Sequence, residues 1–350
     1  MTSLSLAPES APPSRNASTE EARRWQQQAA RFRARSTGRA IAELATTVLP
    51  LLALFVLMYL SLDYSYWLTL ALAIPTAGFH VRTFIIMHDC AHGSFTPNKT
   101  ANELIGTATG FASLTPFAQW RREHAIHHAS SGDLDRRGHG DIDTLTVREY
   151  LALSPAQRFK YRIVRNPLIL LIFGPIFLFI THRLPLSAGQ RSQHAFSVMV
   201  TNVVIVACLV LAHYTIGIGT LLAVFVPVTL MAGAMGIWLF YVQHQFEGAY
   251  WERHEAWDYA TAAMRGSSYY RLPRVLEWMT GSIGLHHIHH LDPKIPSYRL
   301  RRCHDSTPEF RNIPELTIRQ SLKSIGLNLW DEEEKRLIGF RYLHRRLRAG

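Results

Sequence analysis

Three histidine groups carry the chemistry that this sequence can perform. They read HDCAH from residue 88, HAIHH from residue 124 and HHIHH from residue 286. On a helix, positions i, i+3 and i+4 share one face, so each group can direct two or three imidazoles at the same point. Imidazole nitrogen suits iron, copper, zinc and nickel. The pattern therefore predicts a metal site without identifying the metal.

Ligand spacing separates the candidate ligands from other histidines. His287 lies about 100° around a helix from His286, so we place it outside the ligand set, although an exchange with a neighbour stays open. His244 ends an apolar run and is a further candidate. His80 precedes His88 by eight residues and could line the site. Eight or nine neutral imidazoles exceed the needs of one tetrahedral zinc ion and fit two adjacent ions.

Long apolar segments must position these groups. Four runs are long enough to cross a hydrocarbon core of about 30 Å at about 1.5 Å per helical residue. The connections 62–65 and 215–219 contain no Lys or Arg, which marks them as the outer side. Two shorter runs, 101–117 and 168–180, are interrupted by Gly and Pro, and we expect neither to span. The four expected spans are residues 41–61, 66–87, 195–214 and 220–241.

The number of spans decides whether one site can form. With four spans, His88, His124, His244 and His286 all emerge on the same basic side. Promoting one short run to a full span would divide them between opposite faces. We therefore predict an all-α, multi-pass membrane protein with four transmembrane helices, two short non-spanning apolar segments and a helical cytoplasmic cap carrying the histidine groups.

The remaining segments complete the expected organisation. Residues 1–20 are rich in Ser, Ala and Pro and are predicted to be a disordered tail, followed by a single membrane domain over 21–350. Residues 20–40 are expected to form one basic helix on the membrane surface. Beyond residue 297 we expect two amphipathic helices, the second containing Leu337, Phe340 and Leu347.

Composition limits the classes of partner. Hydrophobic residues make up 48% of the chain and the formal net charge is +11. No nucleic-acid-binding spacing accompanies that charge, so a surface facing anionic lipid explains it better. Three scattered cysteines with no CxxC pair point to a reducing compartment.

The histidine groups and their flanks resemble a known family. The segments HDCAHGSF, REHAIHHA and HHIHHL are similar to the three histidine boxes of integral-membrane fatty-acid desaturases. The segment SGDLDRRG, residues 131–138, is most similar to bacterial omega-6 (delta-12 type) acyl-lipid members. The likeness covers roughly residues 40–310. It implies a non-haem di-iron site whose ligands are His88, His92, His124, His127, His128, His244, His286, His289 and His290.

The resemblance also implies the reaction. Two iron ions and O2 would remove two hydrogens from adjacent carbons of a fatty-acyl lipid, leaving a cis double bond, with no catalytic residue beyond the metal ligands. The chain has no His-Pro-Gly-Gly haem motif and no dinucleotide-binding glycine pattern. Electrons are thus expected from a separate ferredoxin or cytochrome b5 type donor. The implied location is a bacterial inner membrane with the boxes on the cytoplasmic side. Where acyl-CoA members place an asparagine, one turn before the ninth histidine, this chain has Phe240. Asp89 and Glu247 could orient imidazole N–H groups of the ligands, and a solvated surface position is the alternative for each.

Three alternatives use the same residues differently. A lipid or carotenoid hydroxylase or ketolase could share the scaffold. A non-enzymatic membrane metal transporter or sensor would be expected to carry ligands near mid-membrane, whereas these cluster near one interface. A membrane zinc hydrolase is disfavoured by the number of ligands.

Overall fold

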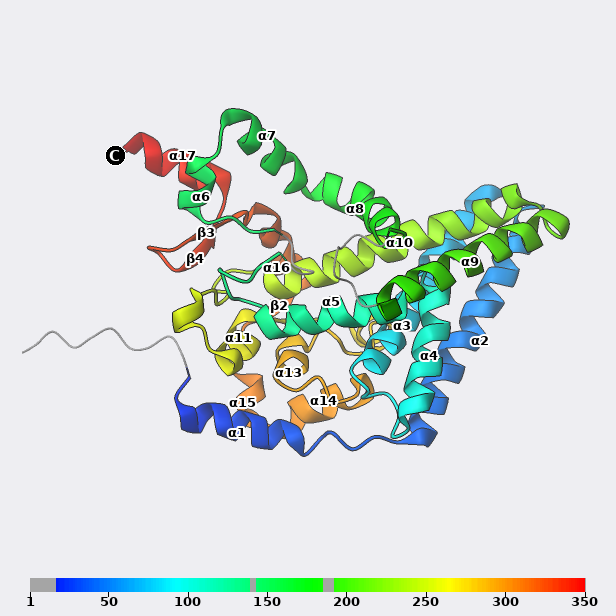
Figure 1. Cartoon of the computed structure of the whole chain (residues 1–350), viewed down its shortest axis with the longest axis horizontal. Helices are drawn as coiled ribbons and strands as arrows, with labels where there is room; N and C mark the ends of the chain where they lie inside the picture. The colour runs from blue at the N-terminus through cyan, green and yellow to red at the C-terminus, as the bar shows by residue number, and fades with distance from the viewer. Residues whose placement is uncertain (1–16, 139–142, 185–191, 350) are drawn as a thin grey trace, which may run out of the picture.

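Four long helices form the main body of the protein (Figure 1). The computed structural model describes residues 17–138, 143–184 and 192–349. Within them, four helices are long and apolar enough to cross a membrane. The predicted all-α fold and its four spans are therefore confirmed. The four are α2 (Thr37–Ser61), α3 (Tyr66–Ala91), α9 (Ser192–Tyr214) and α10 (Ile218–His244).

The long helices form two hairpins whose tight connections lie at the same end of the molecule (Figure 1). Helix α3 is the most buried of the four because it packs against α2, α10 and α4 (Lys99–Ala112). The outer faces of α2 and α9 are apolar and exposed, as at Leu49 and Val203. Such faces match the acyl chains of a bilayer.

The two shorter apolar runs form separate helices. Helix α4 has 14 residues, a length of about 21 Å. Helix α8 (Pro167–Thr181) follows α7 (Pro155–Val164) after a bend of 78°. The bend has a local cause, because the Asn166 side chain accepts from the Leu168 amide and Pro167 occupies the first helical position.

Short elements build a cap around the end of the body opposite the tight connections (Figure 1). Its strands form two pairs, β1 (Tyr269–Arg271) parallel to β2 (Glu315–Thr317), and β3 (Leu329–Asp331) antiparallel to β4 (Arg336–Ile338). The other elements are helical. They are α1 (Thr19–Ala30), α5 (Phe117–Ser130), α6 (Val147–Ala152), η1 (His254–Ala256), α11 (Tyr259–Gly266), α12 (Arg274–Met279), α13 (His286–Leu291), α14 (Ser297–Ser306), α15 (Pro308–Arg311), α16 (Ile318–Ser321), η2 (Leu322–Gly326) and α17 (Phe340–Ala349).

The N-terminal region differs from the expectation. Of the predicted tail, residues 1–16 lie outside the described residues, and α1 begins at Thr19 with Ser18 accepting from the Glu21 amide. The single basic helix expected over residues 20–40 is wrong in extent, because α1 ends at Ala30 and α2 starts at Thr37. The apolar side of α1, with Trp25, is buried against α11 and α13. This face therefore contacts protein.

The last helix is also shorter than predicted. Leu337 lies in β4, opposite Trp330 of β3, and only Phe340 and Leu347 belong to α17. Pairing with β3 buries Leu337 and Trp330 together, a cross-strand contact that a helical pattern does not reveal.

Candidate metal centre

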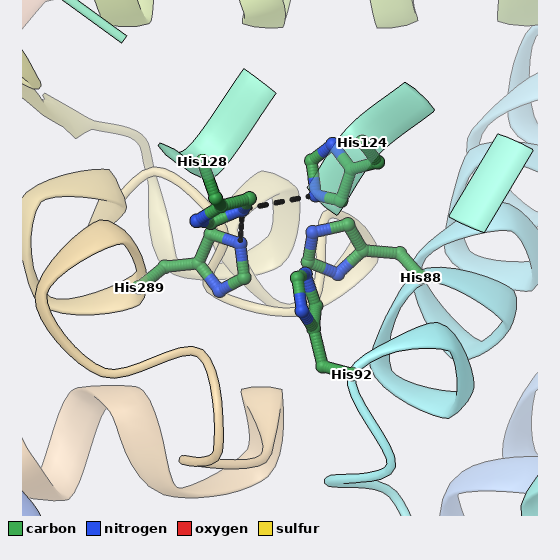
Figure 2. Close-up of side chains that lie close together, drawn as sticks. All are labelled: His88, His92, His124, His128 and His289. Atoms are coloured by element: carbon green, nitrogen blue, oxygen red, sulfur yellow. Dashed lines mark hydrogen bonds between the residues drawn. The ribbon is translucent and has the colours of Figure 1, made fainter. Parts of the chain in front are cut away.

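The structure brings nine histidines from the three boxes and α10 into two adjacent groups. Figure 2 shows the first group, in which rings from α3, α5 and α13 point toward one another. In each group the facing nitrogen atoms all lie within 4.8 Å of one another. The first group is His88, His92, His124, His128 and His289. The second group is His127, His244, His286 and His290.

Each group draws on several elements. The C-terminal ends of α3 and α10 both reach the site, α3 with His88 and His92 and α10 with His244. Helices α5 and α13 each divide their histidines between the two groups. On α5, His127 joins one group while its neighbour His128 joins the other. The sequence spacing placed these rings on one side of a helix but could not show that division.

Distances between ring nitrogens show how closely the rings converge. His128 Nε2 lies 3.0 Å from the Nε2 atoms of both His124 and His289. In the second group, His286 Nε2 lies 3.0 Å from His244 Nε2 and 3.1 Å from His290 Nε2. The His128 and His290 rings stack with centroids 4.2 Å apart, so the two groups touch.

Burial keeps six of these rings neutral. For the histidines outside the spanning helices, burial is the main cause that holds the pKa well below the usual 6.5, and the neighbouring imidazoles lower it further. A neutral imidazole offers the lone pair that a metal ion requires. The histidines with this lowered pKa are His92, His124, His128, His286, His289 and His290.

The imidazole nitrogens are arranged to bind metal ions rather than to hydrogen-bond with one another. A neutral Nε2 carries one hydrogen or one lone pair, so His128 Nε2 cannot pair fully with two other Nε2 atoms at once. His88 Nε2 and His92 Nε2 are buried and make no hydrogen bond within the described residues. Buried polar atoms without partners are costly. A metal ion in each group would satisfy converging lone pairs, and the all-imidazole donor set suits a transition metal.

Polar groups beside the rings can fix their orientation. Asp89 Oδ1 lies 3.4 Å from His88 Nδ1, and Asp89 Oδ2 accepts from the Ser297 amide at 2.7 Å. A carboxylate that holds Nδ1–H leaves Nε2 free for a metal. Ser131 Oγ lies 3.4 Å from His244 Nδ1. Asp89 was a candidate from sequence, whereas Ser131 was missed because only the fold brings it to α10.

Aromatic rings cover both groups. Trp120 stacks on His124 with centroids 4.4 Å apart. The centroid of the Phe240 ring lies 5.0 Å from that of His127 and 5.2 Å from that of His244. Trp120 could have been found from its position one turn before His124 on the same helix.

Three other candidates lie outside both groups. His287 is buried between the rings of Tyr269, His304 and Phe310, as its position on the helix predicted. His80 is buried in α3, with its ring edge-on to Phe225. Glu247, which the sequence offered as a partner for a ligand, is exposed.

Comparisons with known proteins show which family this sequence resembles. The sequence model of the family described as "Fatty acid desaturase" matches residues 65–319. A "Fatty acid desaturase" of Bacillus subtilis is 45% identical over 315 residues, covering 90% of this chain and 89% of its own. The "sn-1 oleoyl-lipid 12-desaturase" of Synechocystis is 28% identical, covering 75% of each chain. The "sn-1 acyl-lipid omega-3 desaturase (ferredoxin)" of Nostoc is 27% identical, covering 71% of this chain and 68% of its own.

Proposed function

The chain belongs to the fatty acid desaturase family, and from this premise we propose that it inserts a cis double bond into a membrane-lipid acyl chain at a histidine-bound di-iron site. The observation that carries the proposal is the convergence of nine imidazoles, seven buried and two half-buried, in two touching groups. Its relatives include an oleoyl-lipid 12-desaturase, which favours a lipid-linked substrate.

Each histidine group would hold one iron ion. His88, His92, His124, His128 and His289 would bind the first ion, and His127, His244, His286 and His290 the second. Nine neutral ligands bring no negative charge to the ions. Five rings in one group also exceed what tetrahedral zinc takes, which favours iron over zinc.

The reaction needs a metal because an alkyl C–H bond has no acidic proton and no leaving group for side-chain acid–base chemistry. When bound, the iron pair supplies the activation of O2 that makes two-electron oxidation of the chain possible. Asp89 holds the His88 ring through Nδ1, and the Ser297 amide in turn holds Asp89. Trp120 and Phe240 cover the rings and exclude water from them.

The remaining parts of the proposal concern the membrane in which the protein lies and the source of its electrons. Relatives from bacteria and four candidate spans support a bacterial inner membrane. The connection 62–65 contains no Lys or Arg, which supports an outer position for that end and a cytoplasmic position for the histidines. A ferredoxin named for one relative supports a separate electron donor of the ferredoxin or cytochrome b5 type.

Product analysis tests the proposed function directly. The full-length chain would be expressed in a bacterial host lacking polyunsaturated lipids, with His128→Ala as the matched control. We expect a new unsaturated acyl chain with the active protein only, located by mass spectrometry after derivatisation of the double bond. Insertion of oxygen into lipid or carotenoid with no new double bond would replace the proposal with a hydroxylase or ketolase.

A further inference from the structure

An arginine-lined cavity lies beside α3, outside the histidine groups. Its volume is about 810 Å³, and α2, α3, α12 and α14 contribute to its lining. Three carboxylates, Glu43, Glu277 and Asp305, also line it. Its arginines are Arg39, Arg82, Arg271, Arg274, Arg301 and Arg302.

The carboxylates are already engaged. Glu43 pairs with Arg82, and Arg301 pairs with Glu277 at 2.7 Å and with Asp305 at 3.6 Å. Arg39 shares Glu43 at 3.5 Å. The lining therefore keeps more positive charge than its own carboxylates neutralise.

Two arginines supply that spare charge most directly. Arg274 and Arg302 are exposed, and neither side chain forms an ion pair or hydrogen bond within residues 17–138, 143–184 and 192–349. Guanidinium groups without a carboxylate are suited to bidentate binding of phosphate oxygens.

The cavity lies at the depth of lipid headgroups and upper acyl chains. Helix α12 packs on the inner half of α3, where the Met279 side chain fills the space beside Gly78. The Trp278 ring lies edge-on to the Phe79 ring, with the ring centroids 5.8 Å apart. Gly78 is about 18 Å along α3 from Tyr66, within a hydrocarbon core of about 30 Å. The outward side of α12 is apolar, with Val275 68% exposed. An exposed apolar turn at this depth contacts lipid.

The cavity also adjoins the metal centre. Ser297, which lines it, donates its amide to Asp89, and Gly281 of the lining packs against Ile85. Asp89 and Ile85 flank His88 on α3. The cavity therefore borders a face of α3 next to the face that carries His88.

From this arrangement we infer that the cavity binds the phosphate-bearing headgroup of a membrane lipid and thereby holds an acyl-lipid substrate beside the histidine groups. The cationic cavity supplies the recognition of phosphate, and the apolar side of α12 points to a lipid as its source. The substrate role rests on the proposed function, but headgroup binding does not.

Binding of soluble short-chain lipids to the full-length protein in neutral detergent tests the inference. The probes are dihexanoyl-phosphatidylglycerol, neutral dihexanoylglycerol and inorganic phosphate, each followed by calorimetry. We expect the double variant Arg274→Gln/Arg302→Gln to weaken phosphatidylglycerol binding at least about fivefold, because each substitution removes a charged hydrogen-bond donor. Arg341→Gln/Arg345→Gln removes two exposed arginines of α17, far from α14 (Figure 1), and should change binding less than about twofold.

Each result has a defined meaning. Equal loss in both double variants, or neutral glyceride binding as tightly as phosphatidylglycerol, would overturn the inference. Inorganic phosphate binding as tightly as the lipid would identify a free-phosphate site and overturn it too. Arg302→Lys keeps the charge and should keep most of the affinity, which guards against a folding defect. Because the readout is binding, a failed desaturation assay would contradict the proposed function and leave headgroup binding standing.

Discussion

His128 and His289 are separated by 161 positions in the chain, yet their Nε2 atoms lie 3.0 Å apart. They come from α5 and α13, which share no hairpin. His128 also meets His124 within its own helix, at the same distance. The first group therefore joins the middle of the chain to its last third.

Removing His128 should abolish catalysis and reduce metal content. His128→Ala takes away the ring that contacts two other ligands. We expect no detectable product and a loss of bound iron, measured by elemental analysis of purified protein. Insertion into the membrane should be unchanged, as judged by membrane fractionation. Full activity in this variant would show that the group is not a metal site.

Adjacent histidines of α13 should behave differently. His286→Ala removes a ring that lies 3.0 Å from His244 and should release metal. His287→Gln changes a buried ring that faces Tyr269 and Phe310 instead. We expect His287→Gln to keep its metal and to lower stability by about 1 kcal/mol, the typical cost of a single substitution. Equal loss of iron in both variants would place His287 among the ligands.

Asp89 should act through His88. Asp89→Asn keeps the volume but removes the charge that accepts from the Ser297 amide and faces His88 Nδ1. Partners that orient metal ligands are typically worth about 10–100-fold in metal affinity. A competition assay with a metal chelator measures the effect. Restoration by Asp89→Glu is not expected, because the longer side chain displaces the carboxylate.

The Glu43–Arg82 pair should stabilise the packing of α2 on α3. Arg82 is buried and bonds Glu43, Thr47 and the Trp278 carbonyl. Glu43→Gln leaves a buried charge without its partner and should lower stability by about 3 kcal/mol. Thermal unfolding in detergent measures the change.

A surface pair provides the control for that experiment. Arg121 and Glu103 form an ion pair with both side chains exposed by more than a third. Glu103→Gln should cost less than about 1 kcal/mol, as is usual for exposed pairs. Similar losses in the two variants would mean that Arg82 is not a buried charge.

The metal-free protein should lose stability as pH falls. Burial lowers the pKa of the cluster histidines, so below about pH 6.5 the unfolded chain takes up protons that the folded chain does not. Above pH 6.5 both states are neutral and stability is level. The free energy of unfolding should fall by about 1.4 kcal/mol per pH unit for each histidine that stays neutral. The histidines concerned include His124, His128, His286, His289 and His290.

Thermal unfolding of chelator-treated protein from pH 7.5 to pH 5 measures that slope. His287, whose pKa burial lowers to about 3, contributes in the same direction. His287→Gln should therefore make the free energy of unfolding fall less steeply with decreasing pH, by the contribution of one histidine. A level profile down to pH 5 would contradict the burial of neutral rings.

The sequence predicts the spans well because hydrophobic length is a local property. The predicted run 66–87 corresponds to α3, Tyr66–Ala91, and the run 41–61 to α2, Thr37–Ser61. The extra turns at the inner ends carry His88 and Arg39, polar residues that a hydropathy pattern excludes but a packed helix accepts. Helical spacing likewise selected the histidines that converge and left out His287.

Tertiary contacts were beyond the reach of such patterns. The burial of Trp25 against α11 and α13 and the position of Ser131 beside His244 both join distant segments. The separation of His127 from His128 into different groups depends on the approach of α13 to α5. Local periodicity carries no information about any of these contacts.

The distribution of the histidines over four helices sets the order of maturation. Chains emerge from the ribosome N-terminus first, and each group needs a ring from α13, near residue 290. While α3 and α5 are already in the membrane, neither pocket yet has its full set of rings. Metal loading must therefore follow the synthesis of α13, and a ribosome stalled before α13 would leave a product that can insert into the membrane but lacks ligands for both metal ions.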